Sequence, residues 1–383
     1  MRELTTGNYA VAEAVRLARA ELVAAYPITP QTPIYEKLAE MDAQGKLPGI
    51  MVKVESEHSA MAECVAASMA GVRVFTATAS QGLALMHEML HFASGNRTPV
   101  VMACVNRVIA APWAFGSDQT DTLAQRDTGW MQFYCEDGQE ALDTVIQAYR
   151  IAEKALIPVM VIMDAFFTSH FMEPIEIPEQ AVVDRFLPAP KLPERFDVKH
   201  PASISNVVNA VKYMEFREQS FRDMEGARPL IKEADGAWGK LTGRTYGVIE
   251  AIQTKDAEIV LVTTGAMTSS ARLAQRKMRE DGVRVGLLKI KAFRPFPYKE
   301  VQEAVSHVRK VAVIDRNCSM GKGGIFCAEL KSALCNLDKR PKVWGYIAGL
   351  SGANVSPEMI EGVVRKTLKQ KNPGELPEWI SEE

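Results

Sequence analysis

Two arrangements of apolar residues alternate along the first half of the chain. Segments in which apolar residues recur at helical spacing are separated by short runs of Val, Ile, Leu and Ala that have the length of strands. The expected strands are Leu22–Tyr26, Ile50–Val54, Val72–Thr76, Pro99–Val105 and Pro158–Asp164. The expected helices are Asn8–Ala20, Pro33–Met41, His58–Met69, Leu83–Ala93 and Glu140–Glu153. This alternation predicts an α/β fold with a parallel sheet that helices cover on both faces.

A second, smaller α/β unit is predicted near the end of the chain. Its expected strands are Glu258–Thr264, Val283–Lys289, Val311–Asp315 and Val343–Ile347, and its expected helices are Ser269–Glu280, Tyr298–His307 and Gly324–Asn336. Before it, His170–His200 is rich in proline and charge, which favours an extended connector packed on a surface. Ser203–Ile252 has mixed helical character and is either an insertion or the edge of the first domain. We therefore expect a first domain over 1–245, with the connector from about residue 170, and a second over 246–383.

Composition narrows the possible functions. The 383 residues hold 45 Lys+Arg against 47 Asp+Glu, so the net charge of −2 argues against a nucleic-acid-binding surface. No uncharged stretch approaches the ~20 residues of a membrane helix, and the N-terminus shows no apolar signal core. The 6 cysteines form no CxxC pair, which argues against a zinc or iron–sulfur site within this chain. Several lie in apolar runs, as reduced thiols of a cytoplasmic protein do.

Candidate chemistry gathers where the expected strands end. Ligands of open parallel sheets bind outside the carboxyl ends of the strands. Those ends carry Pro27–Pro33, Glu55–His58, Thr78–Gly82 and Asn106–Arg107, so one edge offers carboxylates, hydroxyls, a glycine and an arginine. GxGxxG is absent, and Met320–Gly324 lacks the spacing of a phosphate loop, so a glycine-rich turn is the better interpretation. His87 and His91 lack a third ligand, which leaves no predicted metal site.

Several strings, in a fixed order, resemble one family. TGNYAVAEA, AYPITPQTP, VESEHSAMAE, TATASQGLALMHE and LAQRDTGW resemble the alpha subunit of 2-oxoacid:ferredoxin oxidoreductases, with the pyruvate branch closest. TTGAMTSSARLA, LLKIKAFRPFP and VAVIDRNCSMGKGG resemble the second domain of that subunit, which is similar to the C-terminal domain of transketolase. The resemblance covers nearly the whole chain except roughly 184–245. It implies a pyrimidine-binding domain for thiamine diphosphate followed by a smaller transketolase-like domain.

The resemblance implies a role for Glu57. Family members use thiamine diphosphate to decarboxylate a 2-oxo acid, pass electrons through iron–sulfur clusters to ferredoxin, and form an acyl-CoA. Glu57 corresponds to the carboxylate that bonds the pyrimidine ring, favours its imino tautomer and so promotes loss of the thiazolium proton. The plainer alternative is an acid that stabilises a helix N-terminus. Glu55, two residues earlier, is the competing carboxylate.

The resemblance also assigns contacts to the substrate and to the cofactor. Thr29 in the YPITP string and Arg107 after the fourth strand correspond to groups that bind the substrate carboxylate, and a guanidinium fork suits that anion. Ser80, Gln81 and Gly82 are assigned to the cofactor together with Glu57. The alternatives are that Thr29 is a turn residue, and that Arg107 pairs with Asp118 or Asp121.

The chain departs from the family pattern in the loop that follows Arg107. Pyruvate enzymes tend to carry a DHQD-like string there, whereas residues 111–121 read APWAFGSDQTD, with Trp113 and Phe115 and no histidine. Pyruvate remains the leading substrate. Aromatic, indole-bearing or branched 2-oxo acids and oxalate stay open, among them phenylglyoxylate and indolepyruvate.

Missing motifs imply partner subunits. No GDG…N motif for the diphosphate and Mg²⁺ is present, so the chain is expected to hold half of the cofactor site and a beta subunit the other half. Iron–sulfur clusters are expected only on partners, namely gamma and ferredoxin-like delta subunits or their equivalents. Two other interpretations are a beta chain of a lipoamide-dependent 2-oxoacid dehydrogenase, against which YPITP and LAQRDTGW argue, and a non-catalytic electron-transfer or scaffold protein.

Overall fold

The computed structural model describes residues 2–193, 196–201 and 203–381. The strands of the first half are β1 (Arg2–Thr6), β2 (Leu22–Ala25), β3 (Ile50–Lys53), β4 (Val74–Thr78), β5 (Val101–Asn106), β6 (Met131–Tyr134), β7 (Val159–Asp164) and β8 (Met172–Glu176). The helices are α1 (Gly7–Leu17), α2 (Thr32–Ala43), α3 (Glu57–Met69), α4 (Ser80–Leu85), α5 (His87–Gly95), α6 (Thr120–Leu123), α7 (Gly138–Ala155), α8 (Gln180–Phe186) and α9 (Ala210–Thr242).

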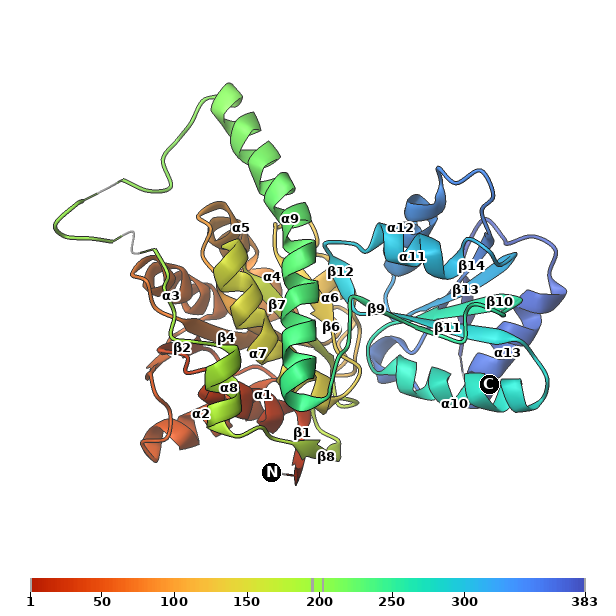
Figure 1. Cartoon of the computed structure of the whole chain (residues 1–383), viewed down its shortest axis with the longest axis horizontal. Coiled ribbons are helices and arrows are strands. Elements are labelled where there is room, and N and C mark those ends of the chain that lie inside the picture. The colour runs from red at the N-terminus through yellow and green to blue at the C-terminus, as the bar shows by residue number, and fades with distance from the viewer. Residues whose placement is uncertain (1, 194–195, 202, 382–383) are drawn as a thin grey trace.

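The rest of the chain forms the second body seen in Figure 1. Its strands are β9 (Ile249–Ile252), β10 (Ile259–Thr263), β11 (Val285–Ile290), β13 (Lys310–Asp315), β14 (Lys342–Ala348) and β15 (Glu378–Ile380). Its helices are α10 (Met267–Glu280), α11 (Tyr298–Val305), α12 (Ile325–Leu334) and α13 (Pro357–Lys369), with a short 3₁₀ turn, η1 (Leu350–Gly352). Strand β12 (Ala292–Arg294) lies in this part of the chain but belongs to the sheet of the first body.

Both main sheets are parallel except at one edge. The first has the order β12-β6-β7-β5-β4-β2-β3, and only β12 runs antiparallel to its neighbour. The second has the order β15-β14-β13-β10-β11-β9, and only β9 runs antiparallel. The expected α/β fold is therefore confirmed. The antiparallel edge strands, of three and four residues, are too short to leave a pattern in the sequence.

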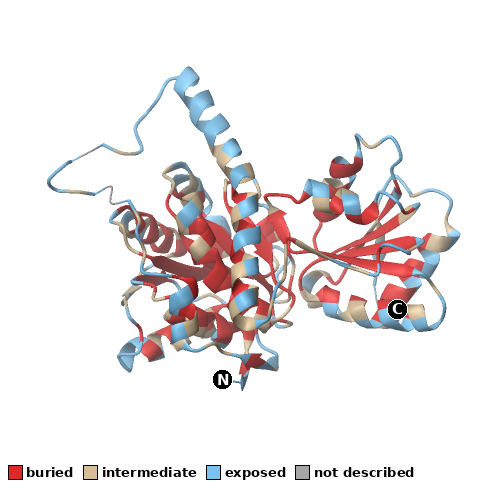
Figure 2. Cartoon of the chain, viewed as in Figure 1, coloured by how far each residue is buried: buried red, intermediate tan, exposed pale blue. Residues whose placement is uncertain are grey.

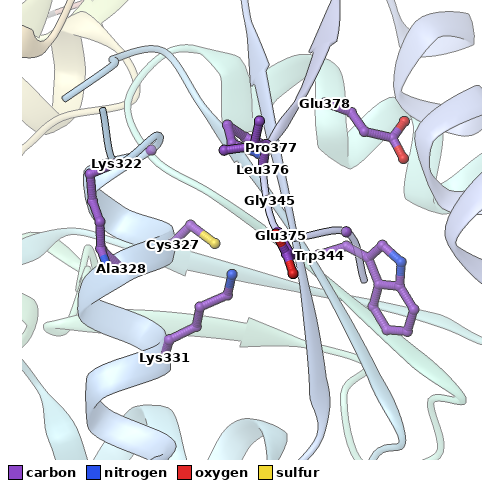
Figure 3. A pocket seen from close by; sticks show the side chains of 12 residues that line it. Lys322, Cys327, Ala328, Lys331, Trp344, Gly345, Glu375, Leu376, Pro377 and Glu378 are labelled. Carbon is purple, nitrogen blue, oxygen red and sulfur yellow. The ribbon is translucent and has the colours of Figure 1, made fainter. Parts of the chain in front are cut away.

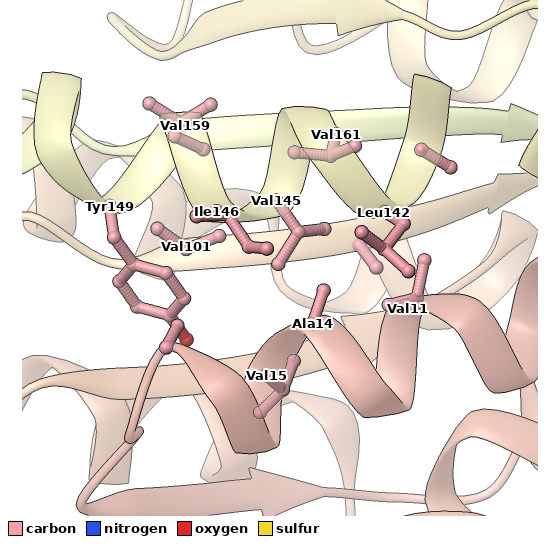
Figure 4. Close-up of a cluster of buried hydrophobic side chains, with 14 of the residues drawn as sticks. Val11, Ala14, Val15, Val101, Leu142, Val145, Ile146, Tyr149, Val159 and Val161 are labelled. Atoms are coloured by element: carbon pink, nitrogen blue, oxygen red, sulfur yellow. The ribbon is translucent and has the colours of Figure 1, made fainter. Parts of the chain in front are cut away.

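The core of the first body lies between its sheet and helices α1 and α7 (Figure 4). Val11 and Val15 of α1 face Leu142 and Ile146 of α7, over strands β5 and β7. All these side chains are nearly inaccessible to water, and each buried aliphatic side chain contributes about 1.5–3 kcal/mol to folding. Asp137 caps α7 by accepting from Glu140 N at 2.8 Å, so a carboxylate fixes where the helix begins.

The opposite face of the first sheet shares a core with the second body. Tyr134 of β6 lies 5.3 Å from Phe326 of α12, and Phe293 of β12 lies 4.9 Å from Phe326, between ring centroids. A buried ion cluster lies beside this contact, in which Lys289 Nζ contacts Glu136 at 3.0 Å and Glu140 at 2.6 Å. The two bodies are thus joined by a strand, an aromatic cluster and ion pairs.

Helix α9 is half packed and half projecting. Its C-terminal part buries Ala227, Ile231, Ala234 and Trp238 against the first body, whereas its N-terminal part extends beyond the body into solvent (Figures 1 and 2). This 33-residue helix lies where only mixed helical character was expected, because exposed apolar residues and an internal Pro229 obscure its period. The connector expected to be extended also contains β8 and α8. Among the described residues, no helix has the length and apolar character needed to cross a membrane.

Candidate active site

The loop after β2 is held by two buried amides. Asn8 Nδ2 donates to the Pro30 carbonyl at 3.0 Å, and Gln31 Nε2 donates to the Tyr26 carbonyl at 2.8 Å. Asn8 lies in the first turn of α1, which approaches the backbone so closely that a Cβ on Gly7 would lie 2.3 Å from the Thr168 carbonyl oxygen. The TGN and YPITP strings therefore fold against each other and fix the backbone around residue 29.

Glu57 is a buried carboxylate at the first turn of α3. Its residue is 6 % exposed, and the preceding Ser56 caps the helix by accepting from Ser59 N at 3.2 Å. A Cβ built on Gly82 would lie 2.5 Å from Glu57 Oε1 and 2.6 Å from Thr78 Oγ1, so the carboxylate packs against this glycine. The Thr78 hydroxyl is buried and has no hydrogen-bond partner among the residues that the structure describes. The Glu57 carboxylate can accept hydrogen bonds, and the unpaired Thr78 hydroxyl can donate one. Together, beside Gly82, they suit a polar ring that carries both donors and acceptors.

The competing carboxylate has a different environment. Glu55 is exposed and accepts a hydrogen bond from the Ser59 hydroxyl, which lowers its pKa. Its carboxylate is therefore occupied at the surface of α3, while that of Glu57 lies under the turn that carries Gly82. The local structure distinguishes the two acids as the register of the motif did.

Arg107 follows β5 and is 4 % exposed. Its Nη1 donates to the Thr29 carbonyl at 2.5 Å, and its Nη2 donates to Gln81 Oε1. In the part of the chain that the structure describes, no Asp or Glu side chain forms an ion pair with this guanidinium. The cation thus lies at the rim of the site, the edge of the sheet where strands β2 to β5 end. Burial lowers the pKa of this guanidinium, and the nearby Asp121 charge raises it. The Thr29 hydroxyl, which the resemblance assigned to the substrate, is not the group that contacts Arg107.

Asp121 lies beneath these loops, fully buried. Its Oδ2 accepts from Ser80 N at 2.9 Å and from Arg107 N at 3.1 Å. Its Oδ1 accepts from Asn106 Nδ2 at 2.6 Å and from Thr122 N at 2.7 Å. The sequence left open an ion pair between Asp121 and the Arg107 side chain, but Asp121 contacts the Arg107 backbone instead. Burial raises the pKa of this carboxyl to about 7, against the hydrogen bonds that lower it.

Two aromatic rings stand over Arg107. Its guanidinium carbon lies 5.8 Å from the Trp113 ring centroid and 5.6 Å from that of Phe115. The rings are 67 % and 52 % exposed, an unusual position for large apolar groups. Their loop is held against the second body, since a Cβ on Gly116 would overlap the Ser351 carbonyl. The aromatic loop therefore borders the site on the side of the second body.

All six residues assigned from the sequence come together at this edge. Glu57 faces Gly82, Gln81 and Thr29 contact Arg107, and Ser80 is joined to Arg107 through Asp121. Sequence reasoning did not identify two features, the Gln81–Arg107 bond and the central position of Asp121. A buried acid in a loop between polar residues carries no periodic signal that would mark it.

The other motifs do not build a second site. At the glycine-rich turn before α12, Asp315 and Asn317 accept from Ile325 N, Phe326 N and Cys327 N, so the donors that a phosphate would need are occupied. A nearby pocket between α12 and the segment before β15 is lined by residues of the second body, among them Lys322 and Lys331 (Figure 3). Among the described residues, no three His, Cys, Asp or Glu side chains are grouped to hold a metal ion.

Two family models and several relatives match this chain over most of its length. Residues 13–235 match the family described as pyruvate flavodoxin/ferredoxin oxidoreductase, thiamine diP-bdg, and residues 257–360 match pyruvate:ferredoxin oxidoreductase core domain II. Pyruvate synthase subunit PorA of Methanothermobacter thermautotrophicus is 44 % identical over 99 % of this chain and 97 % of its own length. Ketoisovalerate oxidoreductase subunit VorA of Pyrococcus horikoshii is also 44 % identical, over the same shares.

Solved structures agree on the fold. A 2-oxoglutarate:ferredoxin oxidoreductase from Magnetococcus marinus superposes with a TM-score of 0.75 at 20 % identity over 96 % of this chain, which spans 65 % of that chain's length. A split-gene transketolase superposes with a TM-score of 0.55 at 13 % identity and supports the pairing of two such bodies. Together with the two near full-length relatives, these findings show that the chain belongs to the 2-oxoacid:ferredoxin oxidoreductase family, as an alpha subunit of the PorA and VorA type.

Proposed function

We propose that this chain supplies the pyrimidine-binding half of a thiamine diphosphate site and the substrate-carboxylate contact of a 2-oxoacid:ferredoxin oxidoreductase. The reaction is the oxidative decarboxylation of a 2-oxo acid with CoA to an acyl-CoA and CO₂, with the electrons passing to ferredoxin. One observation carries the proposal: the buried Glu57 carboxylate has no hydrogen bond or ion pair to another described residue, and it faces Gly82 and the orphaned Thr78 hydroxyl.

The residues at the rim divide the work between cofactor and substrate. Thiamine diphosphate, when bound, supplies a nucleophilic carbon and a sink for the electrons released by decarboxylation. Glu57 places a negative charge at the pyrimidine ring, where it stabilises the protonated ring nitrogen. Gly82, which lacks a side chain, lets the Glu57 carboxylate approach the turn, and Glu57, Thr78 and the Ser80–Gln81 turn would hold the ring.

Arg107 binds the substrate carboxylate in this proposal. Its guanidinium is cationic, forms no ion pair with an acid of the described chain and is already oriented by the Thr29 carbonyl and Gln81. A preoriented fork loses little freedom on binding a planar anion. We propose pyruvate as the substrate. Ketoisovalerate is the second candidate, because Trp113 and Phe115 offer exposed apolar surface directly above Arg107.

The missing half of the site defines the partners. We propose a beta subunit that carries the diphosphate and Mg²⁺, and gamma and ferredoxin-like delta subunits, or their equivalents, that carry the iron–sulfur clusters. Exposed apolar side chains around the rim, Tyr26, Leu85 and Ile109 besides the two aromatic rings, support a partner docked there. The free cysteines of the described chain fit a cytoplasmic enzyme.

The Glu57→Gln variant tests the cofactor half of the proposal. Glutamine keeps the volume but removes the charge, so the complex should assemble with its clusters intact. Hydrogen–deuterium exchange at the thiazolium carbon, measured at saturating thiamine diphosphate, should slow by about 10²–10⁴-fold. Glu55→Gln is the matched control and should exchange at the wild-type rate. The reverse pattern, with only the Glu55 variant impaired, would show that the wrong carboxylate was chosen.

Two further measurements test the partners and the substrate. The isolated chain should bind thiamine diphosphate weakly in calorimetry, and tight binding would disprove the half-site. The native complex, supplied with CoA and a redox dye, should oxidise pyruvate or ketoisovalerate faster than phenylglyoxylate, indolepyruvate or oxalate. Failure to oxidise any 2-oxo acid would refute the proposed activity.

A further inference from the structure

We propose that Asp121 is the positioning residue of this site, a role that rests on the function proposed above. Asp121 contacts neither the surface of the rim nor the guanidinium of Arg107. It joins the backbones of the two loops that carry the cofactor and substrate contacts. The inference is that the spacing between these two contacts is set by one buried carboxylate.

The geometry of the carboxylate supports this role. Oδ2 accepts from the backbone N–H of Ser80, which begins the turn to Gly82, and from the backbone N–H of Arg107, which directly follows β5. The bond between Gln81 and the Arg107 guanidinium then joins the side chains above the same two backbones. Asp121 Oδ2 therefore fixes the distance between the backbones of the Ser80 and Arg107 loops. The hydrogen bond between the Gln81 and Arg107 side chains joins the same two loops a second time.

The other oxygen fixes the carboxylate itself. Oδ1 accepts from Asn106 Nδ2 and Thr122 N, and Thr122 Oγ1 in turn lies 2.9 Å from Tyr134 Oη. Every polar neighbour of the carboxylate is a donor, so both oxygens must be acceptors. An aspartate meets this requirement in its ionised form, whereas an asparagine would present an NH₂ group to two N–H donors whichever way it turned.

The turn that Asp121 holds needs support. Ser80 has a φ of 49°, in the left-handed region that residues with a side chain rarely adopt. Its N–H donates to Asp121, and its hydroxyl lies 2.6 Å from the Val108 carbonyl and also close to Gln81 Oε1. Loss of the bond to Asp121 should let the turn relax, and Gln81 and Gly82 would shift with it.

The test uses the native complex carrying Asp121→Asn. Displacement of a binding group by about 1 Å can cost on the order of 10²-fold, so kcat/KM for the preferred 2-oxo acid should fall by about 10–100-fold. The loss should appear mainly as a raised KM, with weaker thiamine diphosphate binding as well. A purely structural role would reduce the active fraction and hence kcat, but leave KM unchanged.

Asp118→Asn is the matched control. Asp118 lies in the same loop and accepts from Thr120 N at 2.8 Å, but it bonds neither Ser80 nor Arg107. Its KM values should stay within about threefold of wild type, as for changes outside the special contacts. If the wild-type complex is active and Asp121→Asn leaves the KM for the 2-oxo acid and the KM for thiamine diphosphate unchanged, the inference is wrong and the proposed function stands. An inactive wild-type complex refutes the proposed function instead.

A second variant covers the case in which Asp121→Asn does not assemble. Asn106→Ala removes one of the four donors and leaves the carboxylate in place. It should raise the substrate KM by a smaller factor than Asp121→Asn, because the backbone bonds to Ser80 and Arg107 remain. Unchanged KM for substrate and cofactor in an assembled Asn106→Ala complex would overturn the inference.

Discussion

Replacement of Arg107 by lysine tests whether the planar shape of the guanidinium matters in addition to its positive charge. Arg107 donates to the Thr29 carbonyl and to Gln81 while it lies beneath Trp113 and Phe115. A lysine keeps the charge but lacks the planar fork, so it cannot hold these partners and a carboxylate together. Loss of one charge-assisted hydrogen bond costs about 1.5–3 kcal/mol, and a weaker stack against the rings about 0.5–1 kcal/mol. The retained charge offsets part of this, which leaves roughly 1–3 kcal/mol.

That free energy corresponds to a roughly 5- to 150-fold fall in kcat/KM. The assay is steady-state dye reduction by the native complex with CoA, across the panel of 2-oxo acids, and the change should appear chiefly in KM. Arg73→Lys is the matched control, because Arg73 is equally buried and pairs with Glu153 at 2.5 Å within the first body. It should lower Tm and leave KM unchanged. An unchanged kcat/KM for every acid in Arg107→Lys, with a lowered Tm, would mean that Arg107 is structural.

Three further outcomes are expected. Gly82→Ala places a methyl group 2.5 Å from Glu57 Oε1 and should weaken thiamine diphosphate binding to the complex by about tenfold or more, or 1.4 kcal/mol; unchanged calorimetric affinity would contradict the assigned ring position. Trp113→Ala should lower kcat/KM for ketoisovalerate more than for pyruvate, whereas an equal fall for both would place the ring outside the pocket. Burial raises the pKa of Asp121 from 3.8 to about 7, so forming the ionised carboxylate that its four donors require costs more free energy in the folded chain than in the unfolded chain; stability is therefore highest below pH 3.8, and this advantage is lost as the pH rises through 7. Relative to Asp121→Asn, wild type should therefore lose on the order of 4 kcal/mol of stability between pH 4 and 8, and parallel pH profiles of Tm would refute the shift.

The central layers of the fold were predictable because they depend on repeated local signals. Strands such as β5 and β7 are continuous apolar runs that only a doubly covered sheet can bury, and α7 has a clear amphipathic period. Strand β6 was missed because the polar Gln132 interrupts its apolar run, and β12 was missed because three residues do not show a period. Helix α9 was expected only as mixed helical character for another reason: its projecting half exposes Tyr213, Phe216 and Phe221, so its polar and apolar faces cannot be told apart in the sequence.

That the candidate residues gather at one edge was predictable, but their contacts were not. The position of Glu57, Thr29 and Arg107 at strand ends follows from the rule that parallel strands present their carboxyl ends at one edge. The partner of Arg107 did not follow, because Asp118 and Asp121 are both near it in sequence and only the fold decides that a carbonyl and an amide take the guanidinium. The orphaned Thr78 hydroxyl is likewise visible only once Gly82 is placed beside it.

The pairing of β12 with β6 has a consequence for the order in which the chain can fold as it is synthesised. Residues 292–294 complete the edge of the first sheet, and the ammonium groups that neutralise the buried Glu140 belong to Lys289 and Lys291. A nascent chain that ends near residue 245 therefore has an open sheet edge at β6 and a buried acid without a cation. The first body should reach its final stability only after residue 294 has left the ribosome, so a gene split at the junction between the bodies would separate a protein from part of its own core.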